Sequence, residues 1–534
     1  MMRKQILWNS DWLFARGDTP EKATPVTLPH TWNAKDGQDG GNDYYRGTCL
    51  YTKAFAAPAH SDSEEVWLEF EGVAMTAVVT LNGHELTRHE GGYATFRVNL
   101  TPALAAQNTL TVAVDNGKNR TVYPQKADFT FYGGIYRPVH LLVVPKAHFA
   151  LDYHGAPGLR ITPVLSADLK TAEIHAEAWV AGTAQSVQFT LGEETLSAPV
   201  TDSKAEGTFK LENVHLWDGV NDPYLYKMQA TLDSGDAVEA NFGCRTIAFD
   251  AEKGFILNGR PYRLCGAARH QDRQGLGNAL TEKEHDEDMA LLREMGANTV
   301  RLAHYQHAQY FYDLCDKYGL VAWAEIPYIT EHMPEGRANT LSQMTELVVQ
   351  NYNHPSIVCW GLSNEITGSG KTEDLVENHK LLNDLCHKLD ATRPTTMAHI
   401  FMLDANDPLV FLPDIRSYNL YYGWYVGEWD QNDAWFDEFH KNHPDAVIGL
   451  SEYGADANPA YQSAKPAKGD WSEGYQAVYH EHMLKMWADR PYIWAMHCWN
   501  MFDFGADGRN EGGKPGQNQK GLVTFDRKIK KDAF

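Results

Sequence analysis

The sequence predicts a multidomain fold of the β plus α/β class, with two β-sandwiches followed by a (β/α)8 barrel. Two patterns along the chain support this prediction. In roughly the first 250 residues, short β-branched segments are broken by Asn-Gly and Asp-Asn-Gly turns, which is typical of antiparallel sandwiches. After residues 255–259, apolar runs alternate with helical patterns, which is typical of a parallel barrel.

The β-rich part divides into two stretches. Its clearest early strands are at residues 66–70, 77–81, 109–114 and 139–144. The pattern pauses at residues 145–148 and resumes over residues 159–247, where residues 172–180 place an apolar side chain at every second position. About 90 to 100 residues of such strands suit one immunoglobulin-like sandwich. We therefore expect domains at residues 1–147 and 148–250.

The rest of the chain, residues 251–534, contains eight apolar runs that could be buried parallel strands. They are residues 262–267, 298–303, 319–326, 357–362, 395–400, 415–421, 446–450 and 492–499. Helical stretches lie between them, such as residues 281–295, where Thr281 and Glu284 offer an N-terminal cap. Eight alternations in this length predict a (β/α)8 barrel. A doubly wound open sheet is the alternative, but no Gly-rich fingerprint follows the first run.

Composition excludes several classes of protein. The 534 residues include 47 Lys plus Arg and 70 Asp plus Glu, a formal net charge of −23. At roughly 100 to 200 residues per domain, this length predicts three or four domains. The acidic excess argues against nucleic-acid binding, which needs a basic face, and Lys and Arg cluster only at residues 528–531.

The sequence offers no membrane or export signal. No stretch approaches the ~18 consecutive apolar residues of a membrane span, and the N-terminus lacks the apolar core of a signal peptide. We therefore expect a cytoplasmic protein with no membrane partner. The seven Cys are scattered without a C-x-x-C pair, so neither a disulfide framework nor a cysteine zinc site is predicted.

Polar and aromatic side chains follow most of the eight runs. They are Arg269, His270, Arg301, His304, Glu325, Asn364, Glu365, Asn419, Tyr421, Ser451, Glu452, Tyr453, Trp499 and Asn500. Barrel enzymes carry their sites at the carboxyl ends of the strands, so these side chains should line one pocket. Two strand-end carboxylates flanked by aromatic rings fit a glycosidase, in which one protonates the leaving oxygen and the other attacks or activates water.

Other interpretations of these strand-end residues have weaker support in the sequence. A single strand-end glutamate is more often a salt-bridge partner at the barrel rim than a catalyst. His270 and His304 could bind a metal with Glu325 or Glu331, but they lack the i, i+4 spacing of zinc proteases. No G-x-S-x-G elbow marks a serine hydrolase. A sugar-binding protein on a degenerate barrel is the alternative from another class, although it would not need two strand-end carboxylates.

Three segments carry a resemblance to a known family: NHPSIVCWGLSNE at residues 353–365, SEYG at residues 451–454 and NTVRLAHY at residues 298–305. Over nearly its whole length the chain resembles glycoside hydrolase family 2, which includes β-galactosidases, β-glucuronidases and β-mannosidases. The resemblance implies a jelly-roll sugar-binding domain, an immunoglobulin-like domain and a catalytic (β/α)8 barrel, in the order read from the strand patterns.

The resemblance also implies roles for individual residues. Glu365 matches the general acid/base and Glu452 the nucleophile of a retaining double displacement, which needs carboxyl groups about 5 to 5.5 Å apart. Asn364 matches the residue that hydrogen-bonds the sugar 2-hydroxyl, and Tyr421 matches a tyrosine beside the nucleophile.

A second group of residues matches positions around the sugar. His270 and His304 match histidines that hydrogen-bond sugar hydroxyls, and Trp499 matches the tryptophan under the glycone. Asp128 matches an aspartate that reaches the pocket from the first domain, so that this domain would complete the site. Arg301 is expected to brace a carboxylate from behind.

The choice of sugar rests on two loops. Residues 269–280 and 501–512 look most like β-galactosidases, so the expected activity is hydrolysis of terminal β-D-galactosides, with a small carbohydrate as substrate. The alternative is a β-glucuronidase or other uronidase, because Lys520 ends an Asn-x-Lys pattern that β-glucuronidases use to bind the sugar carboxylate. The acidic chain adds a mild field against anionic substrates.

The chain departs from the large bacterial β-galactosidases at several points. Ile329 and Glu331 stand where those enzymes hold magnesium, so a ligand pattern for magnesium or sodium is not matched and no cofactor is predicted. Ala455 replaces a histidine three residues after the nucleophile. Family members commonly form dimers or tetramers, so we expect a homo-oligomer. The sequence ends at Phe534, which predicts either a truncated chain or an incomplete eighth helix.

Overall fold

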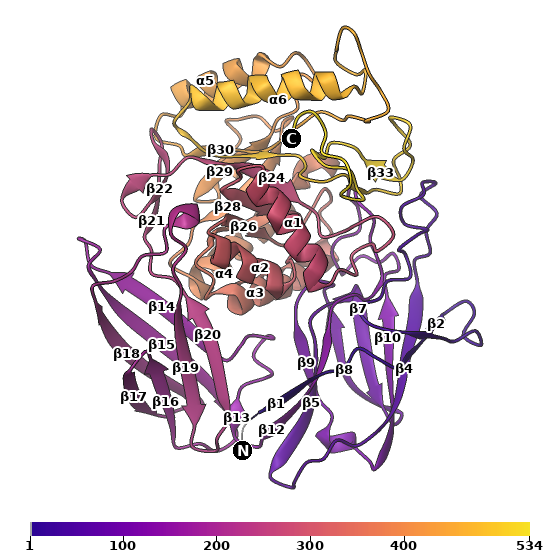
Figure 1. Cartoon of the computed structure of the whole chain (residues 1–534), viewed down its shortest axis with the longest axis vertical. Coiled ribbons are helices and arrows are strands. Elements are labelled where there is room, and N and C mark those ends of the chain that lie inside the picture. The colour runs from indigo at the N-terminus through magenta and orange to yellow at the C-terminus, as the bar shows by residue number, and fades with distance from the viewer. Residues whose placement is uncertain (1–2) are drawn as a thin grey trace.

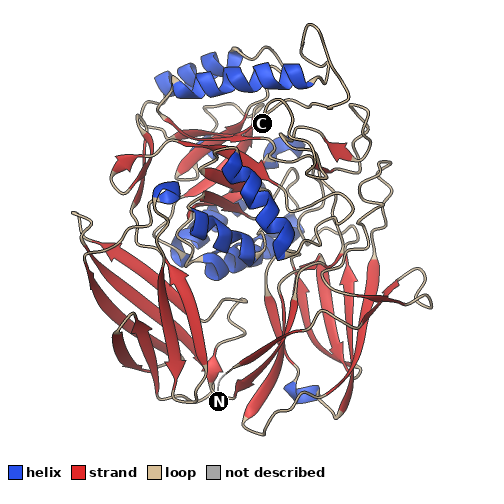
Figure 2. Cartoon of the chain, viewed as in Figure 1, coloured by secondary structure: helices blue, strands red, loops and turns tan. Residues whose placement is uncertain are grey.

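The computed structural model describes residues 3–534 as two β-sandwiches and one barrel (Figure 1). The sandwiches lie at one end of the molecule, and the barrel lies over both of them. Figure 2 shows that the sandwiches are built almost wholly of strands, whereas the long helices belong to the barrel. The predicted fold class is confirmed.

The first sandwich packs a four-stranded sheet against a six-stranded one. The smaller sheet has the order β1 (Lys4–Leu7), β12 (Val139–Pro145), β5 (Glu64–Phe70) and β9 (Phe96–Asn99). The larger sheet has the order β3 (Thr24–Val26), β2 (Trp12–Arg16), β4 (Thr48–Ala56), β10 (Gln107–Asp115), β7 (Thr76–Leu81) and β8 (His84–Glu90). A short pair, β6 (Val73–Ala74) and β11 (Gly134–Ile135), lies beside them. Leu110, Val112 and Val114 of β10 are buried, as the period of two in a half-buried strand requires.

The second sandwich joins two four-stranded sheets. In one, β15 (Thr171–Ala181) pairs with β13 (His148–Phe149), β14 (Leu159–Leu165) and β18 (Lys204–Glu212). The other has the order β17 (Glu194–Pro199), β16 (Ser186–Leu191), β19 (Tyr226–Leu232) and β20 (Ala237–Phe242). Alternate residues of β15 are buried, which confirms the predicted alternation. A small sheet of β21 (Ile247–Asp250), β22 (Gly254–Leu257) and β23 (Arg260–Pro261) then leads into the barrel.

Eight parallel strands close the barrel. They are β24 (Leu264–Arg269), β25 (Thr299–Leu302), β26 (Val321–Glu325), β27 (Ile357–Asn364), β28 (Thr395–Ile400), β29 (Ile415–Asn419), β30 (Ile448–Tyr453) and β31 (Ile493–Cys498). Each of the eight predicted runs overlaps one of them, although several bounds differ by two or more residues. Every residue of β26 and β27 is buried, because helices cover the outside and packed side chains fill the inside.

Six α-helices accompany these strands in the described part of the chain. They are α1 (Glu282–Glu294), α2 (Gln309–Tyr318), α3 (Arg337–Asn351), α4 (Glu373–Leu389), α5 (Gln431–Asn442) and α6 (Glu473–Ala488). The expected capping box of Thr281 and Glu284 begins α1. The prediction of a helix after every strand is wrong after β28, where the connection forms only a short 3₁₀ turn. That connection is rich in turn-forming Asp and Asn and includes Pro408, which cannot continue a helix.

The chain after β31 is irregular. It contains two short strands, β32 (Phe504–Gly505) and β33 (Gln517–Asn518), which pair with each other. Among residues 3–534, no helix has both the length and the apolar character needed to cross a membrane.

Specific hydrogen bonds dock the first sandwich onto the barrel. The side-chain oxygen of Asn339, on α3, accepts a bond from the backbone N–H of Tyr123 at 2.9 Å, and its amide donates to the Glu90 carbonyl at 3.0 Å. The Tyr123 ring is buried and packs edge-on against Tyr328 of the barrel. The side chains of the segment between Tyr123 and β11 therefore have a fixed position relative to the carboxyl ends of the barrel strands.

We predict that Asn339→Ala lowers the unfolding midpoint. The substitution leaves a buried N–H and a carbonyl without partners, at a cost of about 1–3 kcal/mol each. Thr345→Ala on the same helix is the control, because its hydroxyl bonds only to the Leu341 carbonyl within that helix. Denaturant unfolding followed by tryptophan fluorescence measures the difference. Equal midpoints for the two variants would contradict this account of the docking.

Candidate active site

One cavity of about 190 Å³ opens at the carboxyl ends of the barrel strands. Seven of the ten predicted site residues line it: Asp128, His304, Asn364, Glu365, Tyr421, Glu452 and Trp499. Glu365 directly follows β27, and Glu452 is the penultimate residue of β30. Arg301, His270 and Lys520 lie behind the lining.

Two donors orient the carboxylate of Glu452. Arg301 Nη1 donates to Oε1 at 2.7 Å, and the Tyr421 hydroxyl donates to Oε2 at 2.7 Å. Burial, followed by the field of Glu452, raises the pKa of Tyr421 well above its usual value, so the phenol keeps the proton that it donates. Glu452 therefore faces the cavity with both oxygens held in place.

Arg301 connects this carboxylate to two neighbouring strands. Its guanidinium is fully buried and donates to both oxygens of Glu325 at 3.0 Å and to the side-chain oxygen of Asn364 at 2.8 Å. Burial alone would raise the pKa of Glu325, but Arg301 and His304 outweigh it and lower that pKa. The arginine is thus paired with ionised Glu325 and fixes the side chains of three strand ends.

Glu365 has a different environment. Burial, and then repulsion from Glu452, raises the pKa of Glu365 to about 7, while a bond from Asn419 Nδ2 to Oε1 at 3.0 Å opposes the shift. Near neutral pH a large fraction of Glu365 is therefore protonated and can donate a proton. One carboxyl group that carries a proton beside another held by cationic and phenolic donors is the arrangement of a glycosidase acid and nucleophile.

The backbone at Glu365 is in the left-handed region, with φ of 46°. Its N–H donates to the Ala398 carbonyl at 2.8 Å, so the chain turns where β27 ends and stays tied to β28. Asn419, from β29, also reaches Asn364 Oδ1 at 3.2 Å and accepts a bond from the Ser451 hydroxyl at 2.7 Å. Non-glycine residues adopt this conformation at a cost, and the surrounding bonds retain it here.

Aromatic rings form another wall of the cavity. His304 stacks on Trp499, with ring centroids 4.8 Å apart, and Phe129 from the first sandwich stacks on His304 at 6.0 Å. His270 lies behind this wall against Phe504, with its Nδ1 3.2 Å from the Tyr305 hydroxyl. Burial, followed by repulsion from His304, lowers the pKa of His270 well below its usual value, so the ring is neutral.

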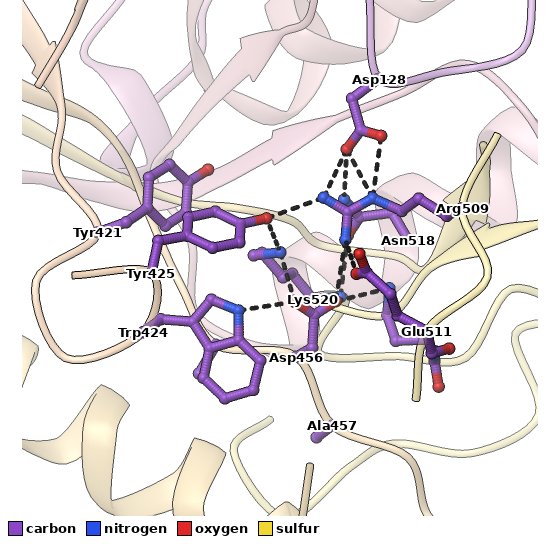
Figure 3. A network of polar contacts seen from close by, with 12 residues as sticks. Asp128, Tyr421, Trp424, Tyr425, Asp456, Ala457, Arg509, Glu511, Asn518 and Lys520 are labelled. Atoms are coloured by element: carbon purple, nitrogen blue, oxygen red, sulfur yellow. Dashed lines mark hydrogen bonds and ion pairs between the residues drawn. The ribbon is translucent and has the colours of Figure 1, made fainter. Parts of the chain in front are cut away.

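A cluster of charged and phenolic side chains lies beside the cavity, and Figure 3 shows the contacts within it. Arg509 lies on the lining, donates from Nε to Asp128 at 2.8 Å and donates from Nη2 to the Tyr425 hydroxyl at 2.8 Å. Lys520 is buried, and its ammonium contacts the same hydroxyl at 2.5 Å and also Asp456. Two cations thus meet at one phenolic oxygen.

The residues after β26 do not fit the magnesium site of the large bacterial β-galactosidases. Ile329 offers no ligand atom, and the Glu325 carboxylate is occupied by Arg301 and His304. In residues 3–534, groups of three metal-capable side chains lie elsewhere, at Glu69, Glu71 and His140 and at Asp313, Asp316 and His354.

Several residues around the cavity were not singled out from the sequence. Arg509, Tyr425 and Phe129 lie in loops, where no strand periodicity places them. Asn419 was recognised as a strand end without its contact to Glu365. The only signal for Arg509 was its place in the loop of residues 501–512, which had been used to choose the sugar.

The fold and the paired carboxylates define a glycoside hydrolase, and comparison with known families agrees. Three family models match consecutive parts of the chain: "Glycosyl hydrolase 2 galactose-binding domain-like" at residues 43–153, "Glycosyl hydrolases family 2" at residues 157–245, and "Glycosyl hydrolases family 2, TIM barrel domain" at residues 250–534. The protein belongs to glycoside hydrolase family 2, as its motifs predicted.

Individual relatives are similar over the whole chain. A β-glucuronidase of Bacteroides fragilis is 39% identical over 100% of this chain and 81% of its own length. The crystal structure of an FMN-binding β-glucuronidase from Faecalibacterium prausnitzii L2-6 is 42% identical, with a TM-score of 0.97 over 100% of this chain and 85% of that one. A putative β-galactosidase structure from Bacteroides fragilis is 36% identical, with a TM-score of 0.94 over 100% and 84%.

We predict that Glu365→Gln stabilises the protein at alkaline pH. The folded-state pKa of about 7 lies above the ordinary value of 4.5, so folding opposes ionisation. The free-energy penalty for ionising Glu365 in the folded protein is absent below pH 4.5 and complete above pH 7, where its removal should raise the free energy of unfolding by about 3 kcal/mol. Denaturant unfolding at pH 5 and pH 8 tests this, with Glu193→Gln on an exposed turn as control. A gain that does not grow with pH would contradict it.

Proposed function

We propose that the protein is a retaining exo-β-glucuronidase. This choice departs from the galactosidase favoured by the sequence and takes up its alternative. The similar proteins named β-glucuronidase support it, although a putative β-galactosidase is also among the similar structures. A property of the cavity itself supports it independently.

The observation that carries the proposal is the set of donors beside Asp128. The Tyr425 hydroxyl accepts bonds from Arg509 and Lys520, so its own proton remains available to an acceptor in the cavity. Arg509, Tyr425 and Asn518 all line the cavity. A hexuronate carboxylate supplies the negative acceptor that these donors need, whereas the primary hydroxyl of a galactoside supplies no charge.

The ion pair between Asp128 and Arg509 does not block the binding of a uronate carboxylate. The side chain of Asp128 is 53% exposed, and exposed pairs contribute about 0–1 kcal/mol. A bound carboxylate can therefore share Arg509 with Asp128 at little cost. Lys520 has another role, because it is buried against Asp456 and acts on the substrate through Tyr425.

The two carboxyl groups then perform a double displacement. Glu452 attacks the anomeric carbon, while Glu365 protonates the oxygen of the leaving group; Glu365 afterwards takes a proton from the water that releases the sugar. The leaving group lies beside Glu365, between side chains from the two flanking strands. Ile329, Ile400 and Phe401 line the cavity there, so this side of the site is apolar.

We predict that an aryl β-D-glucuronide is cleaved with a kcat/KM at least about 100-fold above that of the matching galactoside. A hydrogen bond to a charged group contributes about 1.5–3 kcal/mol, so Arg509→Ala should lower glucuronide kcat/KM by about 10- to 150-fold. Lys520→Ala should lower it by a smaller factor, because Lys520 acts through Tyr425. Galactoside turnover should be nearly unchanged. Exposed Lys118→Ala is the control.

Two other results of the comparison between the glucuronide and the galactoside would favour a different function. Preferential cleavage of the galactoside would return the assignment to the sugar first expected from the sequence. A folded protein that cleaves neither substrate would favour the sugar-binding alternative.

We predict that Glu452→Gln abolishes turnover while the protein still folds, with a lower thermal midpoint because Arg301 loses one of its charged partners. In the parent enzyme kcat/KM should fall as pH rises through about 7, because only protonated Glu365 can donate to the leaving group. Glu365→Gln should remove this alkaline limb and slow hydrolysis of poor leaving groups by about 10²–10⁴-fold. Proton NMR should detect the β-anomer as first product. A first-formed α-anomer would contradict the retaining mechanism.

A further inference from the structure

A second cavity, of about 220 Å³, lies at the opposite end of the barrel from the catalytic one. The second sandwich contributes Arg245 and Thr246 to it, and the segments that precede β27 and β28 contribute Pro355 and Arg393. A Cβ on Gly243 would come within 2.8 Å of Pro355, so the two domains meet closely at the back of this cavity. The cavity wall is therefore well fixed.

Arg245 is the notable group in this wall. Its Nε donates to the Pro355 carbonyl and its Nη2 to the Ile357 carbonyl at 2.6 Å, which leaves Nη1 without a partner among residues 3–534. The two acidic residues whose fields reach it are engaged elsewhere: Asp390 pairs with Arg393 at 2.7 Å and Asp316 with His354 at 2.6 Å. The guanidinium thus has no carboxylate partner in the described structure.

The Arg245 side chain is half-buried on the cavity wall and lacks a counter-charge there. Burial, and then repulsion from Arg393, lowers the pKa of Arg245 to about 9, yet the group still carries its charge at neutral pH. A half-buried cation at a cavity wall can be stabilised by an anion that also accepts hydrogen bonds. The carbonyls of Pro355 and Ile357 provide only part of this stabilisation.

The rest of the lining suits an anion that has an apolar part. No Asp or Glu is among the described residues that line the cavity, although the chain carries a net charge of −23. The Thr246 hydroxyl has no partner among the described residues, whereas the Thr392 hydroxyl donates to Asp390 at 2.6 Å and the Thr162 hydroxyl shares a bond with the Tyr352 hydroxyl at 3.0 Å. Phe242 and Ile247 provide an apolar surface beside them.

We propose that this cavity binds a phosphate monoester, with its phosphoryl oxygens on Arg245 and Thr246 and its organic part against Phe242 and Ile247. Three phosphoryl oxygens can use an arginine N–H and more than one hydroxyl together, which the two oxygens of a carboxylate do less well. Binding is non-covalent and leaves the ligand unchanged. The proposal does not depend on which sugar the catalytic cavity accepts.

Calorimetric titration of the full-length protein with phenyl phosphate, inorganic phosphate and benzoate, at constant ionic strength, tests the site. We expect saturable binding of the phosphates at one site and at least tenfold weaker binding of benzoate. Thr246→Glu should weaken phosphate binding at least tenfold, because it places a carboxylate beside Arg245 without touching the bonds to Pro355 and Ile357. Thr195→Glu, on an exposed position of the same sandwich, should bind like the parent protein.

Other results of the titration would support or overturn the proposed phosphate site. Tighter binding of phenyl phosphate than of inorganic phosphate supports an organic monoester, and equal binding overturns the contribution of the apolar wall. Benzoate binding as tight as phosphate would overturn the choice of phosphate. Phosphate binding that survives Thr246→Glu and competes with the hydrolysed substrate belongs to the catalytic cavity and would also overturn the proposal. Hydrolysis itself should be equal in the parent protein and both variants.

Discussion

The buried guanidinium of Arg301 is the contact on which the catalytic cavity depends. It joins Glu325, Asn364 and Glu452, which come from three different strands. Removing one partner from a buried ion pair typically costs about 3–5 kcal/mol, because the remaining charge is left without compensation. The network therefore links the stability of the barrel to the orientation of its carboxylates. A rigid arrangement of this kind is what a retaining mechanism requires, since the acid and the nucleophile must both lie on the same small substrate.

Assembly of the domains is the second requirement. The barrel alone supplies the carboxylates, but Asp128 and Phe129 reach the cavity from the first sandwich. Their position depends mainly on the bond from the Tyr123 N–H to Asn339, and the partly exposed pair between Asp128 and Arg509 adds little. The β-rich half of the chain thus contributes part of the substrate cavity, and the long sequence separation between Asp128 and Arg509 is bridged only in the folded molecule.

The sequence predicted those features that are determined by local periodicity. Strand alternation and the helical spacing after residue 281 follow from which faces must be buried, so the sandwiches, the barrel and its strands could be recognised. Glu365 and Glu452 could be located because carboxyl ends of parallel strands converge. Arg509, Tyr425 and Phe129 could not, because they lie in loops whose course is set by tertiary contacts. Lys520 was noticed from its motif, but its burial against Asp456 depends on chain segments 64 residues apart.

The expected effect of charge on the choice of substrate differs most between the sequence and the structure. A net charge of −23 suggests a field that disfavours anionic substrates, but at physiological salt that field decays over about 8 Å. The donors beside the cavity act at hydrogen-bond distance: Arg509 and Lys520 reach the Tyr425 hydroxyl at 2.8 and 2.5 Å. Hydrogen bonds to charged groups contribute about 1.5–3 kcal/mol each, more than a screened surface field can oppose. In the proposed function, the preference for a uronate over a neutral sugar is therefore decided by three or four side chains, and the overall charge of the protein has little influence on it.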